Sequence, residues 1–253
     1  MSAGKSAIRW GARSCLEAWI CPLWTRLFMG VMAAIGLFGV GWAGAEESSS
    51  ATIRLLAFSR VGEETEVIVS GPGGTQIGDT PLNLPTRQLS QPLVVQMRRL
   101  EFRSAAEPSQ ILGRTELPAG GNSFILVFFP RDAAGADPYR VEALALPDSG
   151  FASGDYAFAN FSGNPVGCVV GERNFVAAPG KLAIYRPMLG AQAAGNQAIV
   201  CYEQIEGQWE TTPFFSSRII VQDGVRNLIL IFRNPDTGRI DFRGIADFIE
   251  TER

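Results

Sequence analysis

The chain repeats part of its own sequence at an almost constant distance, and this self-similarity constrains the fold more than any other feature. Residues 53–59 resemble residues 156–162, which lie 103 positions later. The block that contains the apolar run 124–128 resembles the block that contains 228–232, 104 positions later. Because order and spacing are repeated together, we infer an internal duplication.

Within each copy, short apolar stretches alternate with glycine and proline turns about every ten residues, which is typical of β-strands. The runs Phe124–Phe129 and Leu228–Phe232 are apolar without alternation, so we expect strands that are covered on both faces. Residues 140–142 resemble 239–241 at an offset of 99, which predicts a hairpin loop five residues shorter in the second copy. Residues 245–249 are compatible with a final strand or with a last turn of helix.

These patterns predict an all-β protein of two tandem antiparallel immunoglobulin-like β-sandwich domains. We place the first domain at residues 52–147 and the second at 151–250, with a short turn between them. A single larger sandwich or barrel that spans both halves is the alternative. Strands exchanged between the copies would blur the boundary.

The first 45 residues have the composition of a secretory signal. Four basic residues precede an almost uncharged run from Leu27 to Ala43, and the small residues Gly44 and Ala45 follow it. We predict that residues 1–45 are a signal peptide cleaved after Ala45, and that residues 46–51 form a polar spacer. A retained membrane anchor is the alternative, because the apolar run is nearly long enough to cross a bilayer. Either outcome predicts an exported protein that is periplasmic, bound to the cell surface or extracellular.

The charge of the exported chain argues against a nucleic-acid partner. Removal of residues 1–45 leaves 18 basic and 24 acidic residues, a net charge of −6. A protein that tracks phosphates needs a basic patch, and the arginines here are spread along the chain. We expect membrane contact only through an uncleaved signal.

Two cysteines remain after cleavage, Cys168 and Cys201. Since an exported protein passes through an oxidising compartment, we predict a disulfide between them. The bond would lie in the second domain alone. Two buried free thiols are the alternative.

The sequence contains no histidine, which removes the most common general base and the most common metal ligand. We therefore predict no enzyme, no metal and no cofactor. Aspartates at predicted turns could still form a carboxylate pair for glycoside hydrolysis, or they are ordinary solvated turn residues. These are Asp132, Asp137, Asp155, Asp236 and Asp241. The oxygen ligands of residues 234–241 could hold calcium or simply close a hairpin turn.

Aromatic residues gather in the second copy, and we take four of them as candidate binding residues. They are Tyr202, Trp209, Phe214 and Phe215. Exposed aromatic rings on a sandwich can stack on sugars or anchor a protein partner. The alternative is that they belong to the core.

The function that these features favour is a non-enzymatic binding or structural module of the bacterial cell envelope or extracellular space. Its partner would be a protein or glycan of the cell surface. One alternative is a subunit of a surface assembly formed by strand addition. Another is a carboxylate-based enzyme that acts on polysaccharide.

Overall fold

The computed structural model describes residues 50–78, 80–131, 137–147, 150–187, 194–234 and 237–248. They belong to one compact unit that begins at Ala45. These residues form seventeen strands and no helix, so none of them forms a helix that could cross a membrane. The prediction of an all-β protein is confirmed. The predicted signal peptide, residues 1–45, and most of the spacer lie outside the described residues.

The N-terminal half of the described chain forms two four-stranded sheets. Sheet A has the order β4-β1-β7-β8 and sheet B the order β3-β2-β5-β6. The strands of sheet A are β1 (Ala51–Ala57), β4 (Leu93–Val95), β7 (Ser123–Pro130) and β8 (Tyr139–Ala145). Those of sheet B are β2 (Glu66–Ser70), β3 (Leu82–Asn83), β5 (Arg99–Ser104) and β6 (Ile111–Glu116).

The C-terminal half repeats this topology. Sheet C has the order β12-β9-β16-β17, and sheet D joins β11, β10, β13 and β15 in that order. The strands of sheet C are β9 (Tyr156–Phe161), β12 (Leu182–Tyr185), β16 (Val225–Arg233) and β17 (Ile240–Phe248). Those of sheet D are β10 (Val166–Val170), β11 (Arg173–Ala177), β13 (Ala194–Ile205) and β15 (Phe215–Gln222), while the short β14 (Gln208–Trp209) pairs with the end of β13.

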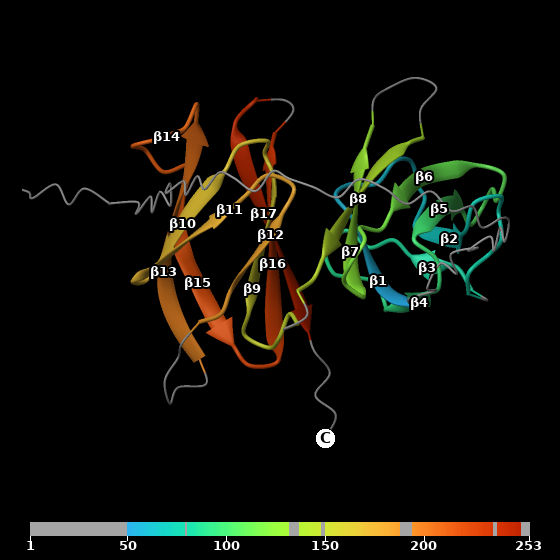
Figure 1. Ribbon diagram of the computed structural model, residues 1–253, viewed down its shortest axis with the longest axis horizontal. Helices are drawn as coiled ribbons and strands as arrows, with labels where there is room; N and C mark the ends of the chain where they lie inside the picture. The colour runs from blue at the N-terminus through green and yellow to red at the C-terminus, as the bar shows by residue number, and fades with distance from the viewer. Residues whose placement is uncertain are drawn as a thin grey trace, which may run out of the picture. The chain divides into compact units, whose positions relative to one another are not determined.

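Two of the four sheets are mixed, so the prediction of purely antiparallel sandwiches is wrong. The first strand of each half runs parallel to a late strand of the same half: β1 to β7, and β9 to β16. Figure 1 shows these strands, far apart in the sequence, lying side by side. Hydrophobic patterns report which face of a strand is buried and carry no information about the direction of its neighbour.

Three apolar layers hold the four sheets in the order B, A, C, D. The first core lies between sheets B and A, and the third between sheets C and D. The second layer, which we call the seam, joins the free face of sheet A to the free face of sheet C. Alternate residues of β7 point into the first core and into the seam, and the same holds for β16 and its two layers. This explains the apolar runs without alternation and confirms that these strands are covered on both faces.

The pairing registers align the two halves more closely than the sequence does. Ile53 pairs with Phe124 in sheet A, and Tyr156 pairs with Asn227 in sheet C, so both strands are matched at an offset of 103. The sequence match of Phe124 with Leu228 is therefore wrong by one residue. A slip of one residue exchanges the faces of a strand, and Phe124 indeed lies in the first core whereas Leu228 lies in the seam.

The hairpin that follows these strands differs less between the halves than the sequence comparison predicted. Val141 pairs with Phe128, and Phe242 pairs with the matching Ile231, which gives an offset of 101 where residue similarity suggested 99. The second hairpin loop is therefore two residues shorter than the first, not five. The final segment is a strand, β17, through Phe248.

The predicted disulfide is confirmed. Cys168 on β10 and Cys201 on β13 are direct cross-strand partners with Cα atoms 4.2 Å apart, and they are joined by a bond. The bond lies within sheet D, next to the third core. In sheet B we match this pair to Val69 and Phe102, which are also cross-strand partners and also lie in an apolar core. One half therefore uses a covalent link where the other uses apolar packing.

We predict that the double variant Cys168→Ala, Cys201→Ala loses about 3 to 4 kcal/mol of unfolding free energy. The bond closes a loop with a sequence separation of 33 residues, and on the chain-entropy model such a loop restricts the unfolded chain by that amount. Urea unfolding of the oxidised protein and of the variant measures the difference. Equal midpoints and slopes would show that the bond contributes nothing to stability.

Three tyrosines tie neighbouring elements together through their hydroxyl groups. The Tyr139 hydroxyl accepts a hydrogen bond from the Val61 N–H at 2.6 Å, and the Tyr156 hydroxyl donates to the Ile220 carbonyl at 2.7 Å. The Tyr185 hydroxyl donates to Gln197 at 2.6 Å. Burial raises the pKa of all three phenols above the ordinary value. Each phenol is therefore held neutral in the folded protein.

This raised pKa predicts a loss of stability in alkali. The stabilisation is complete below the unfolded pKa of about 10 and falls as the pH rises through the higher folded value. We expect the urea midpoint to fall above pH 10 in the wild type and to fall less in Tyr156→Phe. At pH 8 the variant should be about 1 kcal/mol less stable, because Ile220 loses its donor. If the urea midpoints of the two proteins fell equally above pH 10, the contribution assigned to the Tyr156 hydroxyl would be wrong.

Candidate functional site

The four aromatic residues chosen from the sequence occupy two different environments. Phe214 and Phe215 pack against the third core, and the Phe215 ring contacts Phe242 with centroids 3.8 Å apart. Tyr202 and Trp209 are half-buried on β13 and β14. The structure does not bring the four rings together as one platform. Tyr202 belongs to a different surface, the outer face of sheet D.

The outer face of sheet D consists of the residues whose register places them away from the third core. Its central rows contain Val200 and Tyr202 of β13, opposite Val169 and Gly167 of β10. At its edges Val176 and Ile220 are 45% and 65% exposed. Along the four strands the register adds Asn174, Asn196, Ala198, Ser216 and Arg218 to this face. Among these described positions, Arg218 is the charged one.

The matching outer face of sheet B has the opposite chemistry. Glu101 lies between Arg103 at 2.8 Å and Arg114 at 3.6 Å, and Arg114 also binds Asp137 at 2.6 Å. A separate exposed pair joins Arg99 to Glu116. Ion pairs therefore cover this face, from the exposed pair of Arg99 and Glu116 to the central pair of Arg103 and Glu101, whose side chains are 20% and 16% exposed.

The contrast is found at matched positions. When the pair Val69 and Phe102 is matched to the pair Cys168 and Cys201, an offset of 99 relates β5 to β13. Arg99, Glu101 and Arg103 therefore correspond to Ala198, Val200 and Tyr202. Three charged positions on one face are three uncharged positions on the other. Sequence reasoning missed this contrast, because the repeated blocks that it aligned did not include β5 and β13, and because aromatic residues were considered without their strand faces.

The candidate catalytic aspartates have separate structural partners. Asp155 is buried, accepts two hydrogen bonds from the Arg186 guanidinium at 2.9 and 2.8 Å, and accepts a third from the Ala152 N–H. Asp137 binds Arg114, and Asp241 accepts the N–H of Phe242. Asp132 and Asp236 lie outside the described residues. No described group of three or more acidic or cysteine side chains is placed to hold a metal ion.

The hairpin proposed as an alternative calcium loop closes through its own backbone. Asn234 N–H donates to Arg239, and Gly238 N–H donates back to Asn234. The Asn234 side chain accepts the N–H of Thr237. These bonds are those of a tight turn between β16 and β17.

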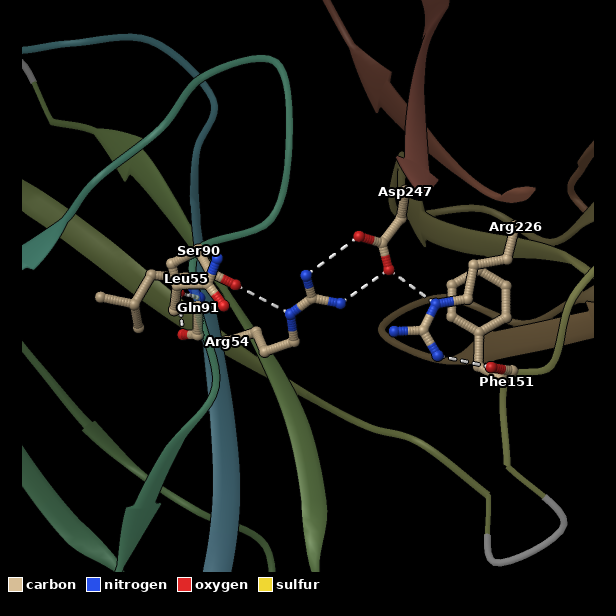
Figure 2. A network of polar contacts seen from close by, with 7 residues as sticks. All are labelled: Arg54, Leu55, Ser90, Gln91, Phe151, Arg226 and Asp247. Atoms are coloured by element: carbon tan, nitrogen blue, oxygen red, sulfur yellow. Dashed lines mark hydrogen bonds and ion pairs between the residues drawn. The ribbon is translucent and has the colours of Figure 1, made fainter. Parts of the chain in front are cut away.

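A buried ionic network crosses the seam at one end (Figure 2). Asp247 of β17 accepts two hydrogen bonds from Arg54 of β1, at 2.6 and 2.9 Å, and one from Arg226 of β16 at 2.6 Å. The side chain of Asp247 is 5% exposed, and those of both arginines are 20% exposed. Sequence analysis missed this network, because Arg54 and Asp247 are 193 positions apart.

The surroundings satisfy the remaining polar atoms of the network. Arg54 also donates to the Ser90 carbonyl at 2.8 Å, and the Ser90 hydroxyl accepts the Leu55 N–H and donates to Gln91. Arg226 donates to the Phe151 carbonyl at 2.5 Å and lies over the Phe151 ring. The network thus fixes sheet A against sheet C at a defined register.

No protein-family model matches this chain, and no curated protein matches it.

We predict that Asp247→Ala destabilises the protein by about 3 kcal/mol, because two partly buried arginines lose their common partner. Replacing all three residues by apolar ones, as Asp247→Leu, Arg54→Met, Arg226→Met, should restore most of this loss. Glu116→Ala is the matched control, since its pair with Arg99 is exposed and should change stability by less than about 1 kcal/mol. Urea unfolding measures all three. An Asp247→Ala effect no larger than that of the control would refute the role of the network.

Proposed function

We propose that the protein is an exported, non-enzymatic module of the cell envelope or extracellular space, and that it binds a protein partner through the outer face of sheet D. The observation that carries this proposal is the chemical contrast between matched faces. The outer face of sheet B is covered by ion pairs, whereas the outer face of sheet D is almost uncharged and exposes Val176 and Ile220.

The composition of the sheet D face favours a protein partner over a glycan. The centre of a protein interface is depleted of charge and contains aromatic and aliphatic side chains. Tyr202 lies among Val169, Val200 and Val176 in this way. Glycan recognition relies on flat aromatic rings, and among the described positions of this face Tyr202 alone has one, while its neighbours are aliphatic. An exposed apolar sheet face of this kind commonly marks an interaction site.

Export is supported by two independent features. The bond between Cys168 and Cys201 is of the type that persists in oxidising compartments. Residues 1–45 have the composition of a signal peptide. Together they favour the periplasm, the cell surface or the extracellular space.

We also propose that the halves are two domains, residues 52–147 and 151–250, that arose by duplication. Their strand orders match, and a single offset of 103 relates the central parallel pairs. We retain an immunoglobulin-like type for each because each packs two four-stranded sheets face to face. The disulfide differs from the usual immunoglobulin bond, since it joins neighbouring strands of one sheet.

A second candidate function, assembly by strand addition, is supported by one difference between the halves. Gly113 lets β6 approach β8 closely, since a Cβ there would lie 2.7 Å from Val141. The matching positions in the second half are Phe215 and Phe242, whose rings are in contact. Among the described strands, β6 and β8 lie close together although they are not paired, whereas β15 pairs with β13, β17 pairs with β16, and β15 and β17 do not approach each other in the same way. These edges are sites where another strand could add.

We predict that Ile220→Glu and Val176→Glu each weaken binding of the purified protein to washed cells of the producing organism by at least tenfold. A carboxylate buried at an interface without a partner is costly. Val94→Glu on β4 is the matched control, because Val94 is an aliphatic residue of similar exposure, 59%, on sheet A. The measurement is bound protein against concentration, with labelled protein of each variant.

Pretreatment of the cells identifies the partner class. Protease should abolish binding. Loss of binding after periodate alone would replace the protein partner by a glycan. Equal binding by the wild type and both sheet D variants would overturn the assigned face, and polymers of the wild type without cell binding would favour strand addition.

A further inference from the structure

The end of the seam opposite the ionic network contains four phenylalanines from matched positions. Phe58 and Phe161 lie at the ends of β1 and β9, and an offset of 103 relates them. The same offset relates Phe129 to Phe232 on β7 and β16. Because β1 is parallel to β7, Phe58 and Phe129 lie at the same end of sheet A. Because β9 is parallel to β16, Phe161 and Phe232 lie at the same end of sheet C.

The four rings form a continuous chain across the seam. Phe161 contacts Phe129 with centroids 4.8 Å apart, Phe129 contacts Phe58 at 5.3 Å, and Phe58 contacts Phe232 at 4.5 Å. They do not fill the end of the seam. A pocket of about 360 Å³ remains among them, and Phe58, Phe161 and Phe232 are only half-buried. This volume is at the lower end of the range for small-molecule sites, about 300 to 1,000 Å³.

Two of the described arginines line the aromatic pocket, and a third lies over one of its rings. Arg140 and Arg233 line it, and the Arg140 guanidinium lies 5.1 Å from the centre of the Phe129 ring. The Arg243 guanidinium lies over the Phe58 ring, 5.7 Å from its centre. Burial, and to a lesser extent repulsion by Arg87, lower the pKa of Arg243.

The acidic groups near these arginines offset part of the charge. Glu142 is paired with Arg140 at 3.0 Å, and both side chains are well exposed. Glu203 is paired with Arg233. Arg243 donates hydrogen bonds to the carbonyl groups of Phe58 and Thr86. The two arginines that line the pocket are therefore paired with carboxylates, and the excess of positive charge near the pocket comes from Arg243.

We propose that this pocket binds a small organic anion with a flat apolar body, such as an aromatic carboxylate. The apolar body would lie against the rings of Phe58, Phe129 and Phe161, and the carboxylate would take hydrogen bonds from Arg140 and Arg233. Edge and face contacts between aromatic rings favour a planar ligand, and guanidinium groups bind carboxylates in matching geometry. The site is separate from the outer face of sheet D, so it stands independently of the proposed partner binding.

The test uses the purified full protein and three probes that share one body. They are 2-naphthoate, 2-naphthylmethanol and 2-naphthylmethylamine, titrated by calorimetry at low salt. We expect one 2-naphthoate to bind per chain, at least tenfold more tightly than the alcohol, and no binding of the amine. Equal binding of acid and alcohol, or tighter binding of the amine, would overturn the anion assignment.

Two variants locate the site. Arg140→Ala should weaken 2-naphthoate roughly tenfold, the effect of losing one charge-assisted hydrogen bond, and should leave the alcohol unchanged. Ser59→Trp should block both, because Ser59 lines the pocket and an indole at this position would fill it without opening the seam. Arg99→Ala on sheet B is the matched control, with a side chain 73% exposed. A loss of binding in the control equal to that in Arg140→Ala, or unchanged binding in Ser59→Trp, would refute the site.

Discussion

The seam between sheets A and C is the interaction on which the rest of the structure depends. It buries the second face of β7 and β16, and without it Ile125, Val127 and Leu230 would face water. Because these strands are central in their sheets, each sandwich would expose a wide apolar surface if it were separated from the other. The two halves therefore stabilise each other, and the described strands belong to one compact unit.

An apolar layer alone specifies burial but hardly fixes how two sheets align, since hydrophobic contacts are not directional. Hydrogen bonds are directional, so the network of Arg54, Asp247 and Arg226 fixes how the two sheets align. Its bonds form only when β1 lies opposite the β16–β17 pair. A buried ionic group of this kind contributes little net stability compared with apolar residues. Its role here is to select one register for the seam, as we infer from its placement at one end of the layer.

The sequence predicted those features that depend on local pattern. Periodicity and turn residues predicted the strands and their coverage on both faces, and the expectation of an oxidising compartment predicted the bond between Cys168 and Cys201. Parallel pairing of β1 with β7 could not be predicted, since alternation does not encode strand direction. The one-residue error in aligning Phe124 arose because apolar strands resemble each other at any register. Asp247 could not be matched to Arg54 by spacing, because only the folded sheets bring them together.

The proposed duplication also explains why the surfaces with the most distinct chemistry are the outer ones. Sheets A and C must remain complementary to each other, so a change in Leu56 or Leu228 affects both halves at once. No such restraint acts on the positions of Arg103 and Tyr202, which correspond to each other on opposite outer faces. Substitutions that distinguish the two copies can therefore accumulate on the outer faces. A difference in charge at matched positions is for this reason more informative about function than the composition of either face alone. By the same reasoning, the phenylalanines retained at matched positions in both halves reflect the packing of the seam, while the arginines at the rim of the pocket, which do not match between halves, give it its charge.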